Sequence, residues 1–171
     1  MSKDIIDELL DDEAFDPKKL FDEKKYNTLI LDREGFNKKQ NETADLLGAL
    51  LDPKITRPES EEIFKSLKDA NAQQLLVNAI QSVKTAGEKA LLTAACWESG
   101  LDFTAHYVFF TELAGSEDFR LAMEALTVVE NCEGTLDEKT IHEALRIARS
   151  SKTAHTSLKE DLITIIKSRQ S

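Results

Sequence analysis

The residues of this sequence that could do chemistry are histidines, cysteines and carboxylates, and their spacing matches no known catalytic or metal-binding motif. His106, His142 and His155 do not form an HExxH pattern, and Cys96 and Cys132 form no CxxC pair. His106 and His142 fall at nearly matching positions of successive predicted helices, which allows a close approach, but no carboxylates complete a metal site around them. No GxSxG, P-loop or GxGxxG motif occurs. The sequence therefore predicts no metal, no cofactor and no catalytic residue.

Two glutamates are the leading candidates for a binding role, because an internal repeat places them at equivalent positions. Glu98 and Glu130 end matching segments, and equivalent residues of stacked repeats project from the same face. Asp102, Glu133 and Asp137 follow near the same predicted helix ends. Together these carboxylates would form an acidic strip for a partner rich in Lys and Arg. The alternative is that solvent-facing helix ends are simply charged, and that Asp102 and Asp137 favour positions near helix N-termini.

The predicted helix over 102–114 is unusually aromatic. Phe103, Tyr107 and Phe110 share one face, and His106, Phe109 and Leu113 share another. A helix that is apolar on nearly all sides is usually buried between neighbours. The other interpretation is a groove that receives a helix or peptide of a partner, in which case Tyr107 is a candidate contact.

Composition narrows the classes of partner. The net charge of −10 repels a phosphate backbone, so nucleic acid is not expected as a partner. The acidity is uneven: residues 71–145 hold twelve acidic and four basic side chains, whereas residues 146–171 hold two and six. A basic segment of another protein fits the acidic middle of the chain best.

Neither terminus nor cysteine usage suggests secretion or a membrane. The N-terminal stretch at residues 1–12 carries acids throughout and has no sustained apolar core, unlike a signal peptide or membrane anchor. Cys96 and Cys132 lie inside apolar helical patterns, which is typical of buried free thiols in a reducing compartment. We therefore expect a cytoplasmic protein without a membrane partner. The oligomeric state stays open.

An internal repeat organises the middle of the chain. A shift of thirty-two positions places residues 95–99 on residues 127–131, and a shift of thirty-five places 100–102 on 135–137. The difference indicates a longer turn, Cys132 to Thr135, in the second copy. A period in the thirties built from two helical segments is typical of an α-solenoid.

Helix starts and stops support this interpretation. Only 3 Pro and 6 Gly in 171 residues favour long helices. Gly100 and Gly115 follow apolar-periodic stretches, where a left-handed C-cap residue is expected. Four Ser/Thr-x-x-Glu capping boxes begin at Thr56, Thr85, Thr135 and Ser157. With the apolar periodicity, these signals predict helices near residues 59–70, 71–84, 86–99, 102–114, 117–131, 136–150 and 157–168.

The first 55 residues differ from the rest. Ile5, Ile6, Leu9 and Leu10 predict a short acidic amphipathic helix, and 44–51 predicts another that stops at Asp52-Pro53. A solenoid needs an end that shields its first repeat, so 1–55 is interpreted as an irregular acidic capping segment. The alternative is a mobile acidic arm whose Ile5/Leu9 face docks elsewhere. Residues 56–171 form the predicted repeat region, within a single domain overall.

The repeat region resembles the HEAT-repeat class over about residues 56–151. The resemblance rests on 91–97, Leu101-Asp102 and 119–126, with Arg120, Ala122 and Ala125 placed as in the opening helix of a HEAT unit. It lacks the proline that often kinks a HEAT helix and an Asp–Arg ladder across units. The resemblance implies an all-α fold, a short right-handed α-α superhelix of HEAT/armadillo-like hairpins, that binds other macromolecules.

The expected function is therefore a non-enzymatic protein–protein interaction module, an adaptor or scaffold. The alternative is a HEAT-like enzyme. HEAT-like DNA glycosylases use a basic groove, where this chain is acidic, and no residue here carries the chemistry of HEAT-type bilin lyases.

Overall fold

The computed structural model describes residues 45–170, and every regular element in that range is helical. A helical stretch at 45–50 is followed by α4 (Arg57–Asp69), α5 (Gln73–Ser82), α6 (Ala86–Glu98), the 3-10 turn η1 (Thr104–His106), α7 (Tyr107–Ala114), α8 (Phe119–Glu130), α9 (Glu138–Ser150) and α10 (Thr156–Ser168). Within these residues there is no strand, so the prediction of an all-α fold is confirmed for them. They belong to one of the two units of the chain, Gln40–Ser171.

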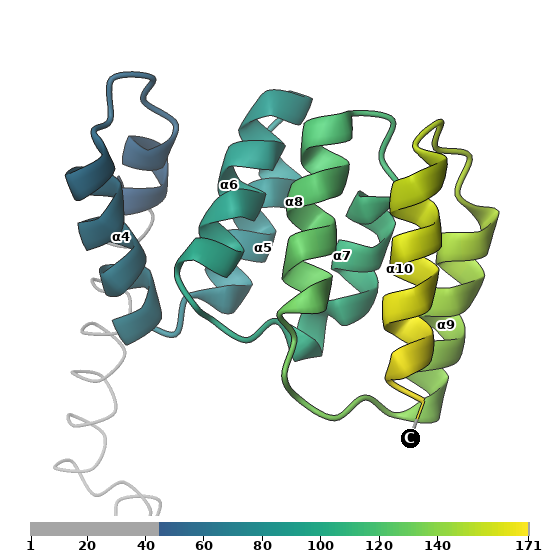
Figure 1. The fold of residues 1–171 in the computed structure, drawn as a ribbon. Coiled ribbons are helices and arrows are strands. Elements are labelled where there is room, and N and C mark those ends of the chain that lie inside the picture. Colours follow the sequence, from purple (N-terminus) through teal and green to yellow (C-terminus); the bar gives the residue numbers. More distant parts are fainter. Residues whose placement is uncertain (1–44, 171) are drawn as a thin grey trace, which may run out of the picture. The chain divides into compact units, whose positions relative to one another are not determined.

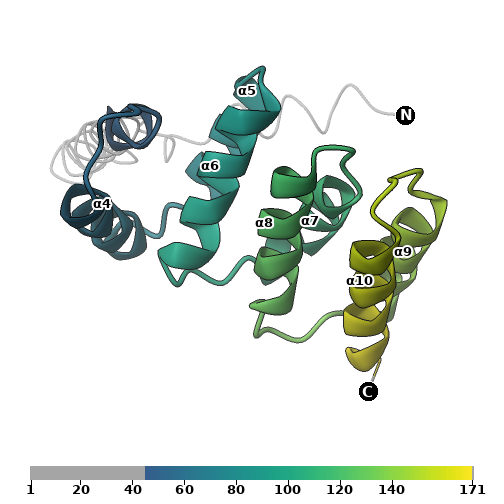
Figure 2. The same cartoon turned by 45° about the horizontal axis from the view of Figure 1, so that its top comes forward.

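Successive helices of this unit pair as hairpins in two layers. α5 packs on α6, α7 on α8, and α9 on α10. In one layer α8 lies between α6 and α10 and contacts both, and in the other α7 contacts α9 (Figure 1). Figure 2 shows the three hairpins following one another along the unit. As a result, α6, α8 and α10 each have one side turned away from the other layer.

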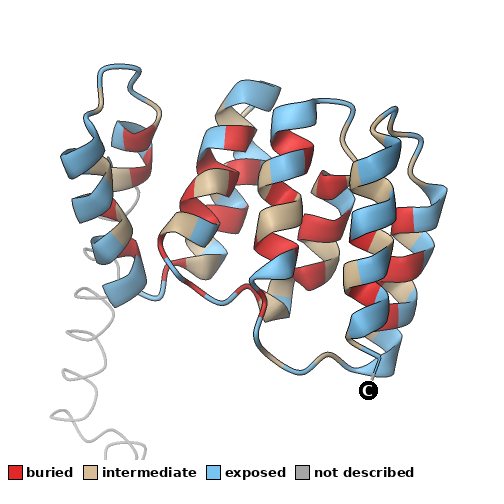
Figure 3. Cartoon of the chain, in the orientation of Figure 1, coloured by how far each residue is buried: buried red, intermediate tan, exposed pale blue. Residues whose placement is uncertain are grey.

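The core lies between the two layers. Apolar side chains of both layers form one cluster, in which Leu76 of α5, Leu92 of α6, Phe110 of α7, Val129 of α8 and Ile166 of α10 are at most 1% exposed. In Figure 3 the buried residues lie where helices face each other, and the outer sides of the helices are mostly exposed. This burial explains why apolar residues recur every three to four positions along each helix.

The internal repeat is visible in the pattern of burial. Cys96 of α6 and Val129 of α8 are both 0% exposed, and Ala95 and Val128, one residue earlier in each helix, are buried as well. The two helices therefore match at a shift of thirty-three positions, one more than the sequence match of residues 95–99 to 127–131 indicated.

Two of the four predicted capping boxes form, at Thr56 and Thr85. At Thr85 the hydroxyl accepts from the Glu88 N–H at 3.2 Å, and the Glu88 carboxylate accepts from the Thr85 N–H at 3.1 Å. The boxes predicted at Thr135 and Ser157 are wrong. The N-cap of α9 is Asp137, and that of α10 is His155, two residues before Ser157.

The two predicted C-cap glycines have different roles. Gly100 follows α6 with φ of +63°, which confirms the left-handed C-cap. Gly115 follows α7 with φ of −84°, so the left-handed conformation predicted there is wrong. The close approach of Ser151 explains this glycine, because a Cβ at position 115 would lie 2.8 Å from the Ser151 Oγ.

The aromatic helix is shorter than predicted. α7 begins at Tyr107 rather than at residue 102, because the Asp102 carboxylate accepts hydrogen bonds from the backbone N–H and hydroxyl of Thr104. This Asx-type turn holds the chain out of the helix until η1. Phe103, Tyr107 and Phe110 are at most 1% exposed, so they form part of the core.

The helix predicted at 44–51 is present over 45–50, and Leu47 and Leu50 are buried in the core cluster. The predicted amphipathic helix at Ile5 to Leu10, and the question of whether 1–55 forms a cap or a mobile arm, fall mainly on residues 1–44, outside those the structure describes.

Candidate interaction surface

Glu98 and Glu130 lie at the C-terminal ends of α6 and α8, the neighbouring helices of one layer. They are not equivalent in environment. The Glu98 side chain is 19% exposed and pairs with Arg57 of α4 at 3.2 Å, whereas Glu130 is exposed and forms no ion pair with the other described residues. At the thirty-three-residue shift, Glu130 matches Trp97 rather than Glu98. The two glutamates still end adjacent helices at the same end of the layer (Figure 1).

Asp102 joins two successive turns. Its carboxylate accepts from the Thr104 N–H at 3.0 Å, from the Thr104 hydroxyl at 2.6 Å and from the Glu133 N–H at 3.3 Å. Partial burial alone would raise its pKa. The hydrogen bonds from Thr104 and Glu133 and the charge of Arg169 outweigh burial, so the pKa of Asp102 is lowered. The structure thus brings the Asp102 side chain and the Glu133 backbone together.

Asp137 caps α9. Its carboxylate accepts from the Thr140 N–H at 2.6 Å, and hydrogen bonds from Thr140 lower its pKa. Both Asp102 and Asp137 therefore have structural roles inside the fold, in keeping with the interpretation of these acids as turn and cap residues. Neither carboxylate lies on the outer side of α6 or α8.

Tyr107 lies in the core rather than on a surface. The residue is 1% exposed, and its hydroxyl has no hydrogen-bond partner among the described residues. Burial raises the pKa of Tyr107 to about 12 and that of the nearby Cys132 to about 11. Arg169 donates to the carbonyls of Cys132 and Gly134 and ties the end of α10 to this turn. These groups form a structural junction between successive hairpins.

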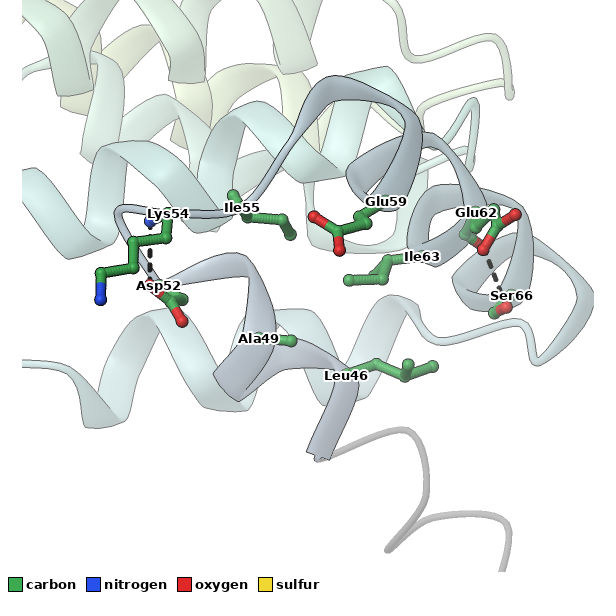
Figure 4. A pocket seen from close by; sticks show the side chains of 9 residues that line it. All are labelled: Leu46, Ala49, Asp52, Lys54, Ile55, Glu59, Glu62, Ile63 and Ser66. Carbon is green, nitrogen blue, oxygen red and sulfur yellow. Dashed lines mark hydrogen bonds between the residues drawn. The ribbon is translucent and has the colours of Figure 1, made fainter.

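The cavities hold no arrangement of reactive groups. One of about 510 Å³ lies between the helical residues 45–50 and α4, with Glu59 and Glu62 on one wall and Leu46 and Ala49 on the other (Figure 4). Glu59 is already used by the Thr56 capping box. A second of about 460 Å³ lies between η1 and the start of α9, lined by His106 and Asp137 among others.

Metal and membrane signals were also sought in residues 45–170. No group of three or more His, Cys, Asp or Glu residues in that range is placed to hold a metal ion. No helix of the same range is both long and apolar enough to cross a membrane.

The surface feature that sequence reasoning missed is apolar. Four large hydrophobic residues of the described range are exposed, and all four lie on α6 and α8: Leu91 (37%), Trp97 (36%), Phe119 (53%) and Met123 (45%). The Trp97 Nε1–H donates to Glu124 of α8 at 2.8 Å, so the indole lies across the line where the two helices meet. We call these four residues, with Glu98 and Glu130 at their C-terminal end, the α6/α8 face.

Other outer helix surfaces are polar. On α10, the third helix of the layer, the outward stripe contains Ser157, Asp161, Thr164 and Ser168, all exposed. On α6 the corresponding stripe is Gly87, Leu91, Ala94 and Glu98, and on α8 it is Phe119, Met123, Leu126 and Glu130. The signal was present in the sequence, because α8 has this second apolar stripe beside the buried Ala122, Ala125 and Val129.

Comparison of the chain with protein-family models, with curated proteins and with solved structures yields no match.

Proposed function

We propose that this chain is a non-enzymatic protein–protein interaction module, an adaptor or scaffold, that uses the α6/α8 face to bind another protein. The observation that carries the proposal is the gathering of the exposed large hydrophobic residues on two adjacent helices of one layer. Isolated exposed apolar residues are ordinary on a protein surface, but apolar residues gathered on one face mark an interaction site. We further propose that the hairpins continue as a short right-handed HEAT-like superhelix, in the cytoplasm.

The state of the ionisable groups favours a binding role over an enzymatic one. General acids and bases work best when their pKa lies near the operating pH. In this chain burial moves the pKa of Cys96, Cys132 and Tyr107 upward, and hydrogen bonds lower that of Asp137. Each of these shifts moves the group away from neutrality. The enzyme alternatives, a DNA glycosylase-type or bilin lyase-type protein, gain no support from these groups.

Site-specific photocrosslinking tests the proposal. p-Benzoylphenylalanine at position 123, on the α6/α8 face, should form covalent adducts with a partner protein in native extract. The same probe at position 164 on α10 is the matched control, because Thr164 is exposed on the outer side of the same layer. Equal adducts from both positions, or none from position 123, would contradict the use of this face.

A further inference from the structure

We infer that the segment bound by the α6/α8 face is an amphipathic helix with an apolar stripe and Lys or Arg residues at one end, an inference that rests on the proposed function. The face is formed by helix side chains, and no strand edge is present among residues 45–170 to pair with an extended peptide. A surface of this kind is recognised through apolar anchors spaced i, i+3 or i+4 and i+7 on a partner helix. α6 has 13 residues, so a partner helix of matching length spans about 20 Å.

The charge at the end of the face sets the polarity of the partner. α6 and α8 each end on a glutamate, and neither has a basic residue in its last turn. α4, α9 and α10 instead carry Lys68, Arg149 and Lys167 in their last turns. Because the C-terminus of a helix carries partial negative charge, a glutamate there is unfavourable in the free protein. Two adjacent helix ends with this arrangement concentrate negative potential beside the apolar residues.

A cation from a partner relieves this potential at the Glu98/Glu130 end. Glu130 has no cation of its own among the described residues, so it is the primary contact, and Glu98 must exchange or share Arg57. At the opposite end Phe119 packs against His155, with ring centroids 5.2 Å apart, and offers no carboxylate of its own to a basic residue. The basic end of the partner helix therefore lies over the C-termini of α6 and α8. The same carboxylates repel an anionic membrane surface.

Selection from a displayed library of helical peptides tests this inference. The immobilised full chain is the bait, the peptides have about 14 residues to match α6, and counter-selection uses Met123→Lys. The recovered peptides should combine an apolar stripe with Lys or Arg at one end and should change the emission of Trp97, the single tryptophan. Recovery of peptides that lack either feature would overturn the inference.

Two charge variants make the test quantitative. In the Glu98→Gln/Glu130→Gln double variant, binding of a recovered peptide should weaken about tenfold at low salt, as expected for two exposed ion pairs. A copy of the peptide with Gln in place of Lys and Arg should discriminate between the two proteins less than twofold. Thr164→Lys on α10 should bind like the original chain. Equal loss for both peptides would show that the glutamates do not contact the basic end.

Other occupants of the face give different outcomes. Sedimentation that shows a dimer dissociated by Met123→Lys would assign the face to a second copy of this chain. Binding to phosphatidylcholine vesicles that Met123→Lys abolishes would assign it to lipid. Either result overturns the inference. Adducts from position 123 together with recovered peptides that lack basic residues would overturn the partner class alone and leave the proposed function intact.

Discussion

Replacing Gly134 by alanine tests the junction that fixes the turns at the acidic end of the helices. A Cβ at position 134 would lie 2.8 Å from both the Oγ1 and the Cγ2 of Thr104 and 3.0 Å from its Cβ. Thr104 cannot move aside freely, because its hydroxyl donates to Asp102 at 2.6 Å and accepts from the Gly134 N–H at 2.9 Å. The added methyl group therefore forces either a shift of the turn or the loss of these hydrogen bonds.

The expected loss follows from these contacts. Overpacking of this kind costs about 1–3 kcal/mol, and each disrupted hydrogen bond costs about 1 kcal/mol. We expect Gly134→Ala to lower the free energy of unfolding by about 2–3 kcal/mol, measured by urea denaturation followed by circular dichroism. Gly87→Ala is the matched control. A Cβ at position 87 of α6 would have no neighbouring atom within 4 Å, so this substitution should be neutral or stabilise by up to about 1 kcal/mol.

A double-mutant cycle identifies the cause. Thr104→Ala removes the two atoms that clash most, so Gly134→Ala should cost about 1 kcal/mol less in that background than in the original chain. An unfolding free energy of Gly134→Ala within about 0.5 kcal/mol of the original would refute the reasoning. It would show that the turn yields without breaking the Asp102–Thr104 contact.

Three further predictions concern the buried and ionisable groups. Tyr107→Phe removes a buried hydroxyl without a partner among the described residues, so its urea midpoint should be unchanged or raised; a clear drop would reveal a hidden hydrogen bond. The pKa of Asp102 is lowered by folding, so its contribution to stability is present above its unfolded pKa of about 4 and is lost as the pH falls through the folded value. Asp102→Asn should make this acid-side fall shallower, which urea titrations between neutral pH and about pH 3 would show. Cys96 and Cys132 are buried with raised pKa values, so both should react with a thiol reagent only as the protein unfolds; fast native labelling would contradict their burial.

Much of the helical organisation could be predicted because its signals are local. The Thr85 capping box, the Gly100 C-cap and the apolar periodicity each depend on residues a few positions apart, and the structure confirms them. The start of α9 was misplaced for a local reason too. Thr135 and Asp137 both qualify as cap residues, and the Asp137 carboxylate accepts the bond from Thr140. Sequence preference alone does not decide between two adequate caps.

The candidate site was harder to predict because it depends on which side of a helix packs. The sequence shows that α8 is apolar on two stripes, but only contact with α7 and α6 decides that Val129 is buried while Met123 is exposed. The pairing of Glu98 with Arg57 joins residues 41 positions apart, and no local pattern indicates it. Tyr107 illustrates the reverse case, since an aromatic residue proposed for a surface is one of the largest fully buried side chains.

The α6/α8 face violates two local rules that the rest of the unit obeys. Its outward residues are apolar where those of α10 are polar, and its helices end on glutamate where α4, α9 and α10 have a basic residue in the last turn. Neither feature helps the free chain to fold, because exposed apolar side chains gain nothing from burial and a C-terminal carboxylate opposes the helix dipole. Departures from local consistency that coincide at one place are expected at functional sites. That both occur on the same two helices is the strongest argument for placing the interaction there.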